Sequence, residues 1–481
     1  MAIKRKKSAK ISLVSTVVVS LMTALLCGKT GAFSQAQSTW NPKWTRHQTV
    51  MVQETAGLVR SNEPVEVEIK FWHSNAGDVE QIEADVKREI RVIHHEGDGR
   101  YTEIPSQVYG IGVDRWHKSE TEPQKVMVRA RIVFQADVQA YETEEFQIYY
   151  GNPEAEEPRY ESPLEVSGGG VHFTIDNSSY RITTEKTSGQ IEQIDLKFAG
   201  EPSLRFNPGP IHWNPGFVQI PDDFPSTMYT WLYAHNFKNP AVEIESGPVL
   251  FSIKRSQFIP GQDIVFMEVV YRFYRDLSYF VMESRIEARK DTRAFVIRND
   301  EMGFRSEDFT HAGWRDKTPE MLEGDDGHIG TTKLFHELRE TETSYHTLAM
   351  TLPPNLAWIS FVNLGRGFGV GSIRLDFCNE NVLTGAPSPL YKSHTVISEH
   401  GGSLYWFRGL IYSKRRPEHR TRDEMNRFAF RIPRGTSYYE KNAYLVYEFD
   451  LGKKFSGIDQ AYFMLREPLR VILIRTEQDM F

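Results

Sequence analysis

The feature that most constrains the fold is a two-residue alternation of apolar and polar side chains. Residues 65–71 place apolar side chains at the odd positions and charged ones at the even positions, and residues 126–134 follow a similar period. This period is typical of β-strands that bury one face. Further runs with strand character lie at 171–175, 180–184, 191–198, 249–254, 264–274, 279–288, 294–298, 357–362, 369–375 and 443–449. Helical periodicity is confined to short candidates near 423–428 and 458–465, so the sequence predicts an all-β protein.

A linker divides the predicted strands into two groups. Residues 154–170 are acidic, then interrupted by proline, then rich in glycine, and they show no apolar period. This composition is typical of a domain boundary, and the chain is too long for one ordinary hydrophobic core. We therefore predict an N-terminal β-module at 37–153, a sandwich or barrel, and a second domain at 171–481. Two packed antiparallel sheets would bury the many strands of the second domain.

The N-terminus has the three parts of a secretory signal. Basic residues at 4–10 precede an apolar run at 11–26 and small residues at Ser34 and Ala36. We predict a signal peptide at 1–36 and a secreted or periplasmic protein. The alternative is a retained single membrane anchor, because the apolar run is almost long enough to span a bilayer. No second segment of spanning length follows.

Removal of the signal changes the charge and the cysteine content. The signal carries six basic and no acidic residues, so the formal charge goes from -7 to -13. A net-acidic protein of this kind is a poor candidate for binding nucleic acid, which requires neutralisation of phosphates. Cys378 is then the one cysteine left, so no internal disulfide can form.

Short motifs resemble known carbohydrate-active proteins. Residues 171–191 resemble the opening of the galactose-mutarotase-like β-supersandwich, which occurs in many polysaccharide lyases and some glycosidases, and residues 245–249 resemble a strand entry of the same fold. The first module, with motifs at 54–60, 63–65 and 104–107 and its end at 149–153, is similar to the accessory β-domains of exo-rhamnogalacturonan-lyase-like proteins. The resemblance implies a β-supersandwich as the expected catalytic domain. These motifs are mostly structural, so they imply the fold more than the activity.

The stretch 299–316 carries the densest group of ionisable side chains, and we predict that it is a loop following a strand at 293–298. For β-elimination on a uronate-containing polysaccharide, His311 suits the base. Asn299 or Arg315 suits the neutraliser of the substrate carboxylate, and Tyr439 or Tyr233 suits the proton donor. We expect these side chains to meet in one groove with His311 at its floor. The alternative is a solvated loop with local ion pairs.

A second group of residues is suited to holding a sugar. Aromatic rings can stack on a sugar face, and arginine, histidine and amide groups can bind hydroxyls and carboxylates. The predicted substrate-binding residues are Trp314, Arg305, His235, Trp213, His400 and Arg408. The alternatives are an aromatic plug over the end of the sandwich for 212–236, strand packing for the rings at 405–407, and a sheet rim for 438–442.

Other chemistries stay open. Glycoside hydrolysis needs two carboxylates that flank the bond, and the available residues are Glu301, Asp300, Asp316, Glu243 and Glu283. Calcium or zinc could bind at Glu301, Asp325 and His328, although their spacing matches no compact ligand motif, so we predict that no cofactor is required. The sequence thus favours a polysaccharide lyase acting on an acidic glycan. A glycoside hydrolase and a non-catalytic glycan-binding surface protein are the alternatives.

Overall fold

The computed structural model describes residues 40–73, 77–116, 125–206, 209–211, 216–219, 230–259, 261–316, 348–352, 356–391, 393–400, 402–412 and 429–474. The predicted signal at 1–36 and the predicted helix at 423–428 lie outside these residues. The chain divides into two units, Met1–Lys43 and Trp44–Phe481, and the fold is that of the second. Antiparallel strands make up most of it, which confirms the all-β prediction.

Two sheets and one helix form the first part of this unit. A five-stranded sheet has the order β28-β1-β7-β3-β4, and a three-stranded sheet has the order β2-β6-β5. The elements are β1 (Arg46–Gln53), β2 (Arg60–His73), α2 (Val79–Glu89), β3 (Arg91–His95), β4 (Tyr101–Ile104), β5 (Ser106–Trp116), β6 (Lys125–Val138), β7 (Thr143–Tyr150) and β28 (Arg470–Ile474). The odd positions of 65–71 are buried in a core shared by both sheets, as the alternation predicts. Helix α2, which the apolar period did not predict, is capped at its N-terminus by Asp78, whose side chain accepts a hydrogen bond from the backbone amide of Gln81.

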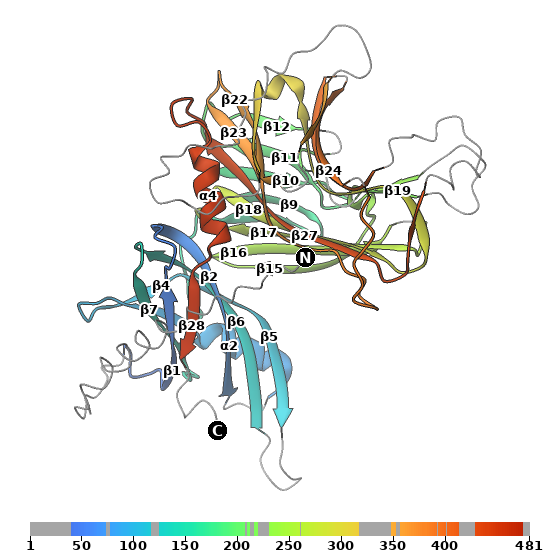
Figure 1. Ribbon diagram of the computed structural model, residues 1–481. Coiled ribbons are helices and arrows are strands. Elements are labelled where there is room, and N and C mark those ends of the chain that lie inside the picture. The colour runs from blue at the N-terminus through green and yellow to red at the C-terminus, as the bar shows by residue number, and fades with distance from the viewer. Residues whose placement is uncertain are drawn as a thin grey trace, which may run out of the picture. The chain divides into compact units, whose positions relative to one another are not determined.

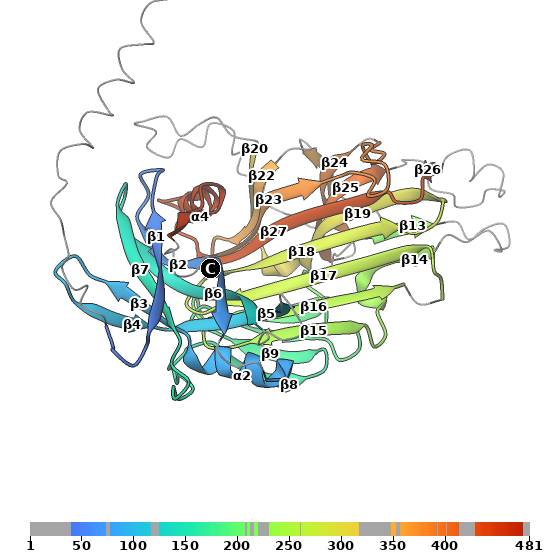
Figure 2. The ribbon, with the colours of Figure 1, turned by 90° about the horizontal axis from the view of Figure 1, so that it is seen from below.

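Three sheets form the rest of the unit (Figures 1 and 2). The five-stranded sheet comprises β8 (Glu165–Gly169), β9 (His172–Asp176), β10 (Tyr180–Thr184), β11 (Ile191–Leu196) and β12 (Ser203–Arg205). The eight-stranded sheet has the order β15 (Ala241–Ser246), β16 (Leu250–Phe258), β17 (Val265–Tyr274), β18 (Tyr279–Ala288), β27 (Ser437–Glu448), β23 (Phe368–Cys378), β22 (Leu356–Asn363) and β20 (His311–Asp316). The seven-stranded sheet has the order β14 (Thr230–Leu232), β13 (Gly216–Gln219), β19 (Thr292–Arg305), β25 (Ser403–Tyr412), β24 (His394–His400) and β21 (Leu348–Leu352), with β26 (Phe430–Ile432) paired to β19.

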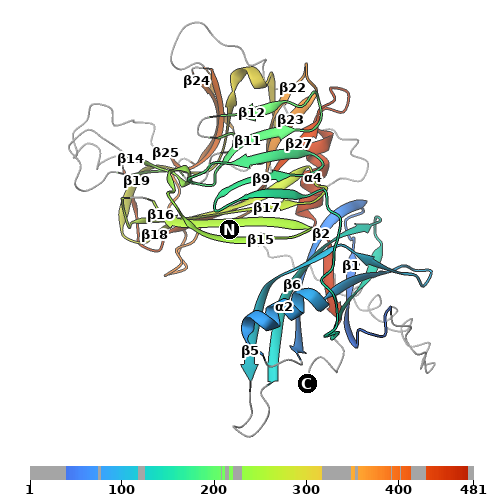
Figure 3. The same ribbon diagram turned by 180° about the vertical axis from the view of Figure 1, so that it is seen from behind.

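The main hydrophobic core joins these three sheets. A second core lies on the other face of the eight-stranded sheet, where helix α4 (Ser456–Arg466) packs on β22, β23 and β27. In Figure 3 the strands β9, β11 and β12 are seen from the side opposite to that of Figure 1. Short 3-10 turns lie at η1 (Ala234–Asn236) and η2 (Ser306–Asp308). Among the described residues, no helix has both the length and the apolar character needed to cross a membrane.

Strand β27 has both faces buried. Tyr444 and Val446 belong to the main core, whereas Ala443 and Leu445 belong to the core beneath α4. The side chains of a strand alternate between the two faces of its sheet. The even positions of β27 therefore face the interior between the sheets, and this places Glu440 there as well.

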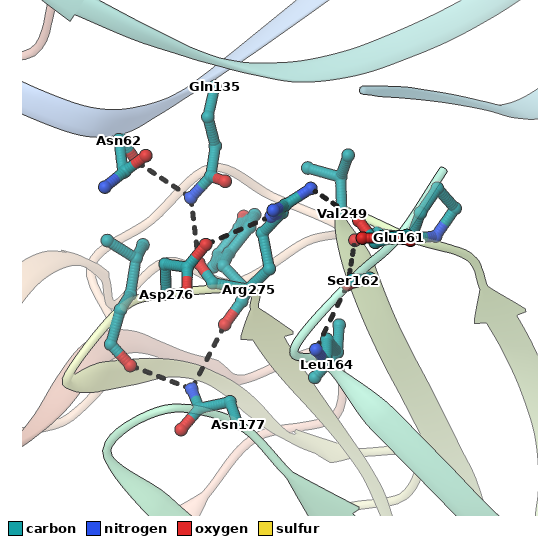
Figure 4. A network of polar contacts seen from close by, with 12 residues as sticks. Asn62, Gln135, Glu161, Ser162, Leu164, Asn177, Val249, Arg275 and Asp276 are labelled. Atoms are coloured by element: carbon teal, nitrogen blue, oxygen red, sulfur yellow. Dashed lines mark hydrogen bonds and ion pairs between the residues drawn. The ribbon is translucent and has the colours of Figure 1, made fainter. Parts of the chain in front are cut away.

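Polar contacts join the first module to the sandwich (Figure 4). The Gln135 side-chain amide donates to the carbonyl of Arg275 at 2.8 Å and to that of Asn62 at 2.9 Å. The Asn177 amide donates to the carbonyls of Tyr274 and Leu277. Because three of these acceptors, the carbonyls of Tyr274, Arg275 and Leu277, lie in the strand end and turn at 274–277, this turn is held from both sides.

The end of the chain returns to the first sheet, a feature that the predicted boundaries do not include. Strand β28 pairs with β1 in antiparallel register, although the predicted second domain at 171–481 includes its residues. The buried Arg60 guanidinium donates to the carbonyls of Met464 and Glu467 at the end of α4 and pairs with Glu54 at 3.2 Å. The sheet to which β28 belongs is determined by its pairing with β1, which lies more than 400 residues away in the sequence. The local pattern of 470–474 carries no information about that partner.

Removal of β28 should destabilise the first module. We expect a chain that ends at Glu467 to unfold at a lower temperature than one that ends at Ile474. The reason is that Leu469, Val471 and Leu473 pack on the core shared by the two sheets of the first module. Loss of these contacts should cost on the order of 3 kcal/mol. Thermal unfolding followed by circular dichroism measures the difference. Equal melting temperatures for the two chains would show that β28 adds nothing to stability.

Candidate functional site

Charged side chains from four strands meet between the eight-stranded and seven-stranded sheets. Asp300 on β19 lies opposite Arg408 on β25 in the strand register. Glu440 on β27 and Arg374 on β23 come from the facing sheet. We call these four residues the interior charged layer. Three of them are almost completely buried, with exposed fractions of 0% for Asp300, 1% for Glu440 and 4% for Arg408.

Glu440 is the centre of the layer. Its Oε1 lies 2.8 Å from Nε of Arg408 and 3.1 Å from Nε of Arg374. These ion pairs do not have hydrogen-bond geometry, so within the described part of the chain neither oxygen of Glu440 receives a hydrogen bond. A buried charge is costly unless it is paired, and two guanidinium groups supply that pairing here. The pKa of Arg374 is lowered to about 10, first by burial and then by the neighbouring Arg408.

Asp300 is a carboxyl group whose ionisation is shifted towards neutral pH. Its Oδ2 accepts a hydrogen bond from Oγ of Ser372 at 2.8 Å, and its Oδ1 accepts one from the hydroxyl of Tyr444. Burial and the negative charge of Glu440 raise the pKa of Asp300 to about 7, against the opposing effect of Arg408. A carboxyl with this pKa can give or take a proton near neutral pH, which is the property required of a general acid or base.

Two register shifts in β19 direct the consecutive side chains of Asn299 and Asp300 into the interior between the sheets. The register with β25 shifts between Ile297 and Arg298 and again between Arg298 and Asp300. Asn299 is consequently buried as well, and its Oδ1 accepts a hydrogen bond from Oγ of Ser284 at 2.7 Å. Bulges that redirect a side chain are common beside active sites.

Two amide side chains in the same region have unfilled hydrogen-bonding capacity. Among the described residues, Nδ2 of Asn299 and both Nδ2 and Oδ1 of Asn442 have no hydrogen-bond partner. Asn442 lies opposite Arg374 in the strand register, so it faces the same layer. Buried polar atoms are almost always satisfied in folded proteins. These atoms therefore indicate a place where water or a polar ligand can bind.

Of the predicted site residues, the structure brings Asn299 and Arg408 into this region. Glu301 is buried nearby, but its Oε2 forms a separate ion pair with Nη1 of Arg298 at 3.1 Å. Burial raises the pKa of Glu301, against the opposing effect of Arg298. Among the described residues, no cluster of histidine, cysteine, aspartate or glutamate side chains could hold a metal ion.

The prediction that 299–316 is a loop is wrong. Strand β19 continues to Arg305, and after η2 the chain forms β20 at the edge of the other sheet. On β20, His311 is half-buried with Nδ1 3.1 Å from Oγ1 of Thr310, and Trp314 is buried in the main core. Arg315 is buried beneath α4, where it pairs with Asp459. None of these side chains takes part in the ion pairs and hydrogen bonds of the interior charged layer.

The other predicted residues lie in separate environments. Tyr439 is on the outer face of β27, where its hydroxyl donates to Glu283 at 3.1 Å, and burial followed by Glu283 raises its pKa. Arg305 is exposed and pairs with Asp308 at 2.8 Å. Tyr233 and His235 stack on each other at η1 with ring centroids 4.7 Å apart, and burial lowers the pKa of His235 to about 4. The expected groove with His311 at its floor is not formed by these residues.

Several predicted residues lie outside the described parts of the chain. Trp213, Asp325 and His328 fall in segments that are not described, and for His400 only the strand backbone is described. Sequence reasoning also missed Glu440, Asn442, Tyr444 and Arg374 as site residues. The segment 438–442, for which a sheet rim was the alternative to a site, lies within β27, which begins at Ser437. The local pattern gave no signal for these site residues, because residues 443–446, which follow, are apolar at odd and even positions alike.

The comparisons with known proteins bear on the fold. No family model matches the sequence, and no curated protein matches it. Among solved structures, an α-mannosidase from Enterococcus faecalis V583 is 12% identical over 90% of this chain and 46% of its own, with a TM-score of 0.51. A protein of glycosyl hydrolase family 38 from Enterococcus faecalis is 12% identical over 91% of this chain and 48% of its own, with a TM-score of 0.53. A galactose mutarotase related enzyme from Lactobacillus acidophilus is 11% identical over 58% of this chain and 100% of its own, with a TM-score of 0.31.

The two Enterococcus faecalis structures define a class of fold. The two Enterococcus faecalis structures show that this chain has a β-sandwich architecture that also occurs in glycosyl hydrolases. At this level of identity the likeness concerns the fold alone. The chain also spans less than half the length of those two proteins.

Proposed function

We propose that this protein is a carbohydrate-active enzyme that cleaves an acidic polysaccharide by β-elimination, with acid–base chemistry in the interior charged layer. The observation that carries the proposal is the pair of buried carboxyl groups, Asp300 and Glu440, which meet two arginines between the sheets. Burial and the charge of Glu440 raise the pKa of Asp300 to about 7. Strongly perturbed carboxyl groups that face other ionisable groups are concentrated at functional sites. The β-sandwich shared with glycosyl hydrolases supports a carbohydrate as the substrate.

The layer holds the chemical groups that elimination needs. The proton next to a uronate carboxylate becomes acidic enough to remove only when that carboxylate is neutralised, and arginine is suited to this role. Arg374 would neutralise the substrate, because its side chain is the least enclosed of the four. Ionised Asp300 would take the proton next to the substrate carboxylate, and the bond to the leaving oxygen would break as the carbon–carbon double bond forms. The Tyr444 hydroxyl, which donates to Asp300, would give its proton to the leaving oxygen and regain one from Asp300.

Glycoside hydrolysis is a second candidate, and one observation favours it. Asp300 and Glu440 are a pair of carboxyl groups in different environments, since one is bonded to neutral hydroxyls and the other is paired with two arginines. Carboxyl pairs divided in this way supply the acid and the base of many glycosidases. The two mechanisms leave different products, so product analysis separates them.

The reaction class can be tested on a panel of pectic, alginate-like, ulvan-like and glycosaminoglycan polymers, with a neutral galactan as control. A lyase should release unsaturated uronate that absorbs ultraviolet light, from acidic polymers and not from the galactan. A hydrolase would release reducing ends without that absorbance. Retention of polymer without shortening would indicate a glycan-binding surface protein and would contradict the proposal.

The proposal places the enzyme outside the cytoplasm, through a signal at residues 1–36. Expression in a bacterial host with fractionation, followed by mass spectrometry of the N-terminus, measures this directly. We expect a processed chain in the exported fraction. An unprocessed chain that stays with the membrane would favour the retained anchor.

A further inference from the structure

A completely buried arginine lies where β16 of the eight-stranded sheet meets the turn between β10 and β11. Arg255 follows Phe251 and Ile253 at alternate positions of β16. Because alternate side chains of a strand share one face, Arg255 faces the same interior as these two residues of the main core. Its exposed fraction is 0%, so the guanidinium has no contact with bulk water.

Three contacts fix the position of the Arg255 side chain. Its Nη1 donates to the carbonyl of Ser188 at 2.6 Å, and its guanidinium carbon lies 4.7 Å from the centre of the Tyr271 ring. Gly189 packs so closely on the stem that a Cβ at this glycine would lie 2.7 Å from Cδ of Arg255. The guanidinium is therefore held in one place before any ligand binds.

One edge of this guanidinium has no acceptor. Among the described residues, Nε and Nη2 of Arg255 are buried without a hydrogen-bond partner, and so is the hydroxyl of Tyr271. Nε and Nη2 lie on the same side of the planar group and direct their hydrogens in parallel, which is the arrangement that binds an anion through two hydrogen bonds. Buried polar atoms are almost always satisfied, so this edge indicates a bound acceptor.

The charge of Arg255 also lacks a close counterion. Within the described part of the chain, Arg255 forms no ion pair with a carboxylate. Burial lowers the pKa of Arg255, against the opposing effects of Tyr271 and of the more distant Glu185. Both oxygens of Glu185 already accept hydrogen bonds from Thr187 and Ser188 in its own turn. Because arginine keeps its proton in proteins, the buried charge requires a closer anion.

We infer that Arg255 and Tyr271 bind a small inorganic anion, chloride, through Nε and Nη2 of the guanidinium and the phenolic hydroxyl. A monatomic anion is close to a water molecule in size, so it suits a position that is closed to bulk solvent. Water alone would accept the hydrogen bonds but would leave the charge uncompensated. The inference does not rest on the proposed function, because these groups take no part in the ion pairs of the interior charged layer.

The direct test is anomalous diffraction from crystals of the full chain grown in sodium bromide, because bromide replaces chloride and scatters anomalously. We expect a bromide peak within hydrogen-bonding distance of Nε and Nη2 of Arg255. Arg60 is the internal control, since it is also buried but is paired with Glu54, and it should carry no peak. A water molecule at Arg255 in place of bromide would overturn the inference.

Thermal unfolding tests the same site in solution. We expect the wild type to melt several degrees higher in sodium chloride than in sodium gluconate of equal ionic strength, because gluconate is too large for the site and an anion that binds only the folded protein raises its melting temperature. Arg255→Met removes the charge and should abolish the difference, and Tyr271→Phe should reduce it. Tyr274→Phe is the matched control, because it removes another buried hydroxyl from β17, and it should keep the wild-type difference.

Two results in solution would overturn the anion site. They are equal melting temperatures of the wild type in chloride and gluconate, and a chloride dependence that persists in Arg255→Met. If Arg255→Met does not fold, Tyr271→Phe and the bromide crystals decide the question. None of these measurements involves turnover, so the anion site and the proposed function can fail separately.

Discussion

Replacing Asp300 with asparagine is expected to reduce cleavage of the acidic polymer by 10²- to 10⁴-fold, the usual contribution of a general acid or base. Asparagine has the size of aspartate and can keep contacts with Ser372 and Tyr444, so the loss should arise from the missing proton exchange rather than from misfolding. Asp263→Asn is the matched control, because it removes an exposed carboxyl group. A folded Asp300→Asn variant with wild-type activity would remove Asp300 from the mechanism.

The same variant should change how stability depends on pH. The folded-state pKa of Asp300 is raised from 3.8 to about 7, so the folded protein holds this proton more tightly than the unfolded chain does. The associated stability is fully present below the unfolded pKa and is lost as the pH rises towards 7. The loss is on the order of 4 kcal/mol, since each tenfold change in proton affinity corresponds to about 1.4 kcal/mol. Urea unfolding at several pH values should show this slope in the wild type and a flatter one in Asp300→Asn.

Loss of Arg315 or Asp459 should destabilise the fold strongly, because the two side chains form a buried ion pair. Nη1 of Arg315 lies 2.5 Å from Oδ1 of Asp459, and the indole of Trp358 donates to the same oxygen at 2.8 Å. Removal of one partner of a buried ion pair leaves an uncompensated charge and typically costs about 3–5 kcal/mol. We expect Asp459→Ala and Arg315→Ala each to lose that much stability in urea unfolding.

Glu307→Ala is the matched control for this pair. It lies in the same stretch, but its side chain is 72% exposed and its ion pair with Arg305, which is 52% exposed, is open to solvent. Such pairs contribute about 0–1 kcal/mol. Activity per folded molecule should be unchanged in Arg315→Ala, because Arg315 lies beneath α4. A stable Arg315→Ala variant without activity would return Arg315 to the role predicted from sequence.

The period of the apolar residues predicted ten of the twenty described strands of the sandwich, β8 to β27. The predicted runs at 180–184 and 279–288 coincide with β10 and β18. The period depends only on neighbours along the chain and on one buried face, so a single sequence reveals it. The predicted helix at 458–465 lies within α4 for the same reason.

The site was less predictable, because burial of charge depends on partners distant in sequence. The density of ionisable groups in 299–316 indicated exposure, yet Asp300 is buried through contacts with residues about 70 and 140 positions away. Arg315 is likewise buried by a partner on α4. Local composition cannot distinguish a charge that is solvated from one that is paired across two sheets.

The most direct test of the central claim is a pH titration of the Asp300 carboxyl in the folded protein. Infrared difference spectra between the wild type and Asp300→Asn report this group. We predict a protonated carboxyl that ionises with a midpoint near 7 and a cleavage rate that follows the same midpoint. In Glu440→Gln the midpoint should fall, because the neighbouring negative charge that disfavours ionisation is gone. A carboxyl that is already ionised at mildly acidic pH, or a midpoint that Glu440→Gln does not move, would contradict the account.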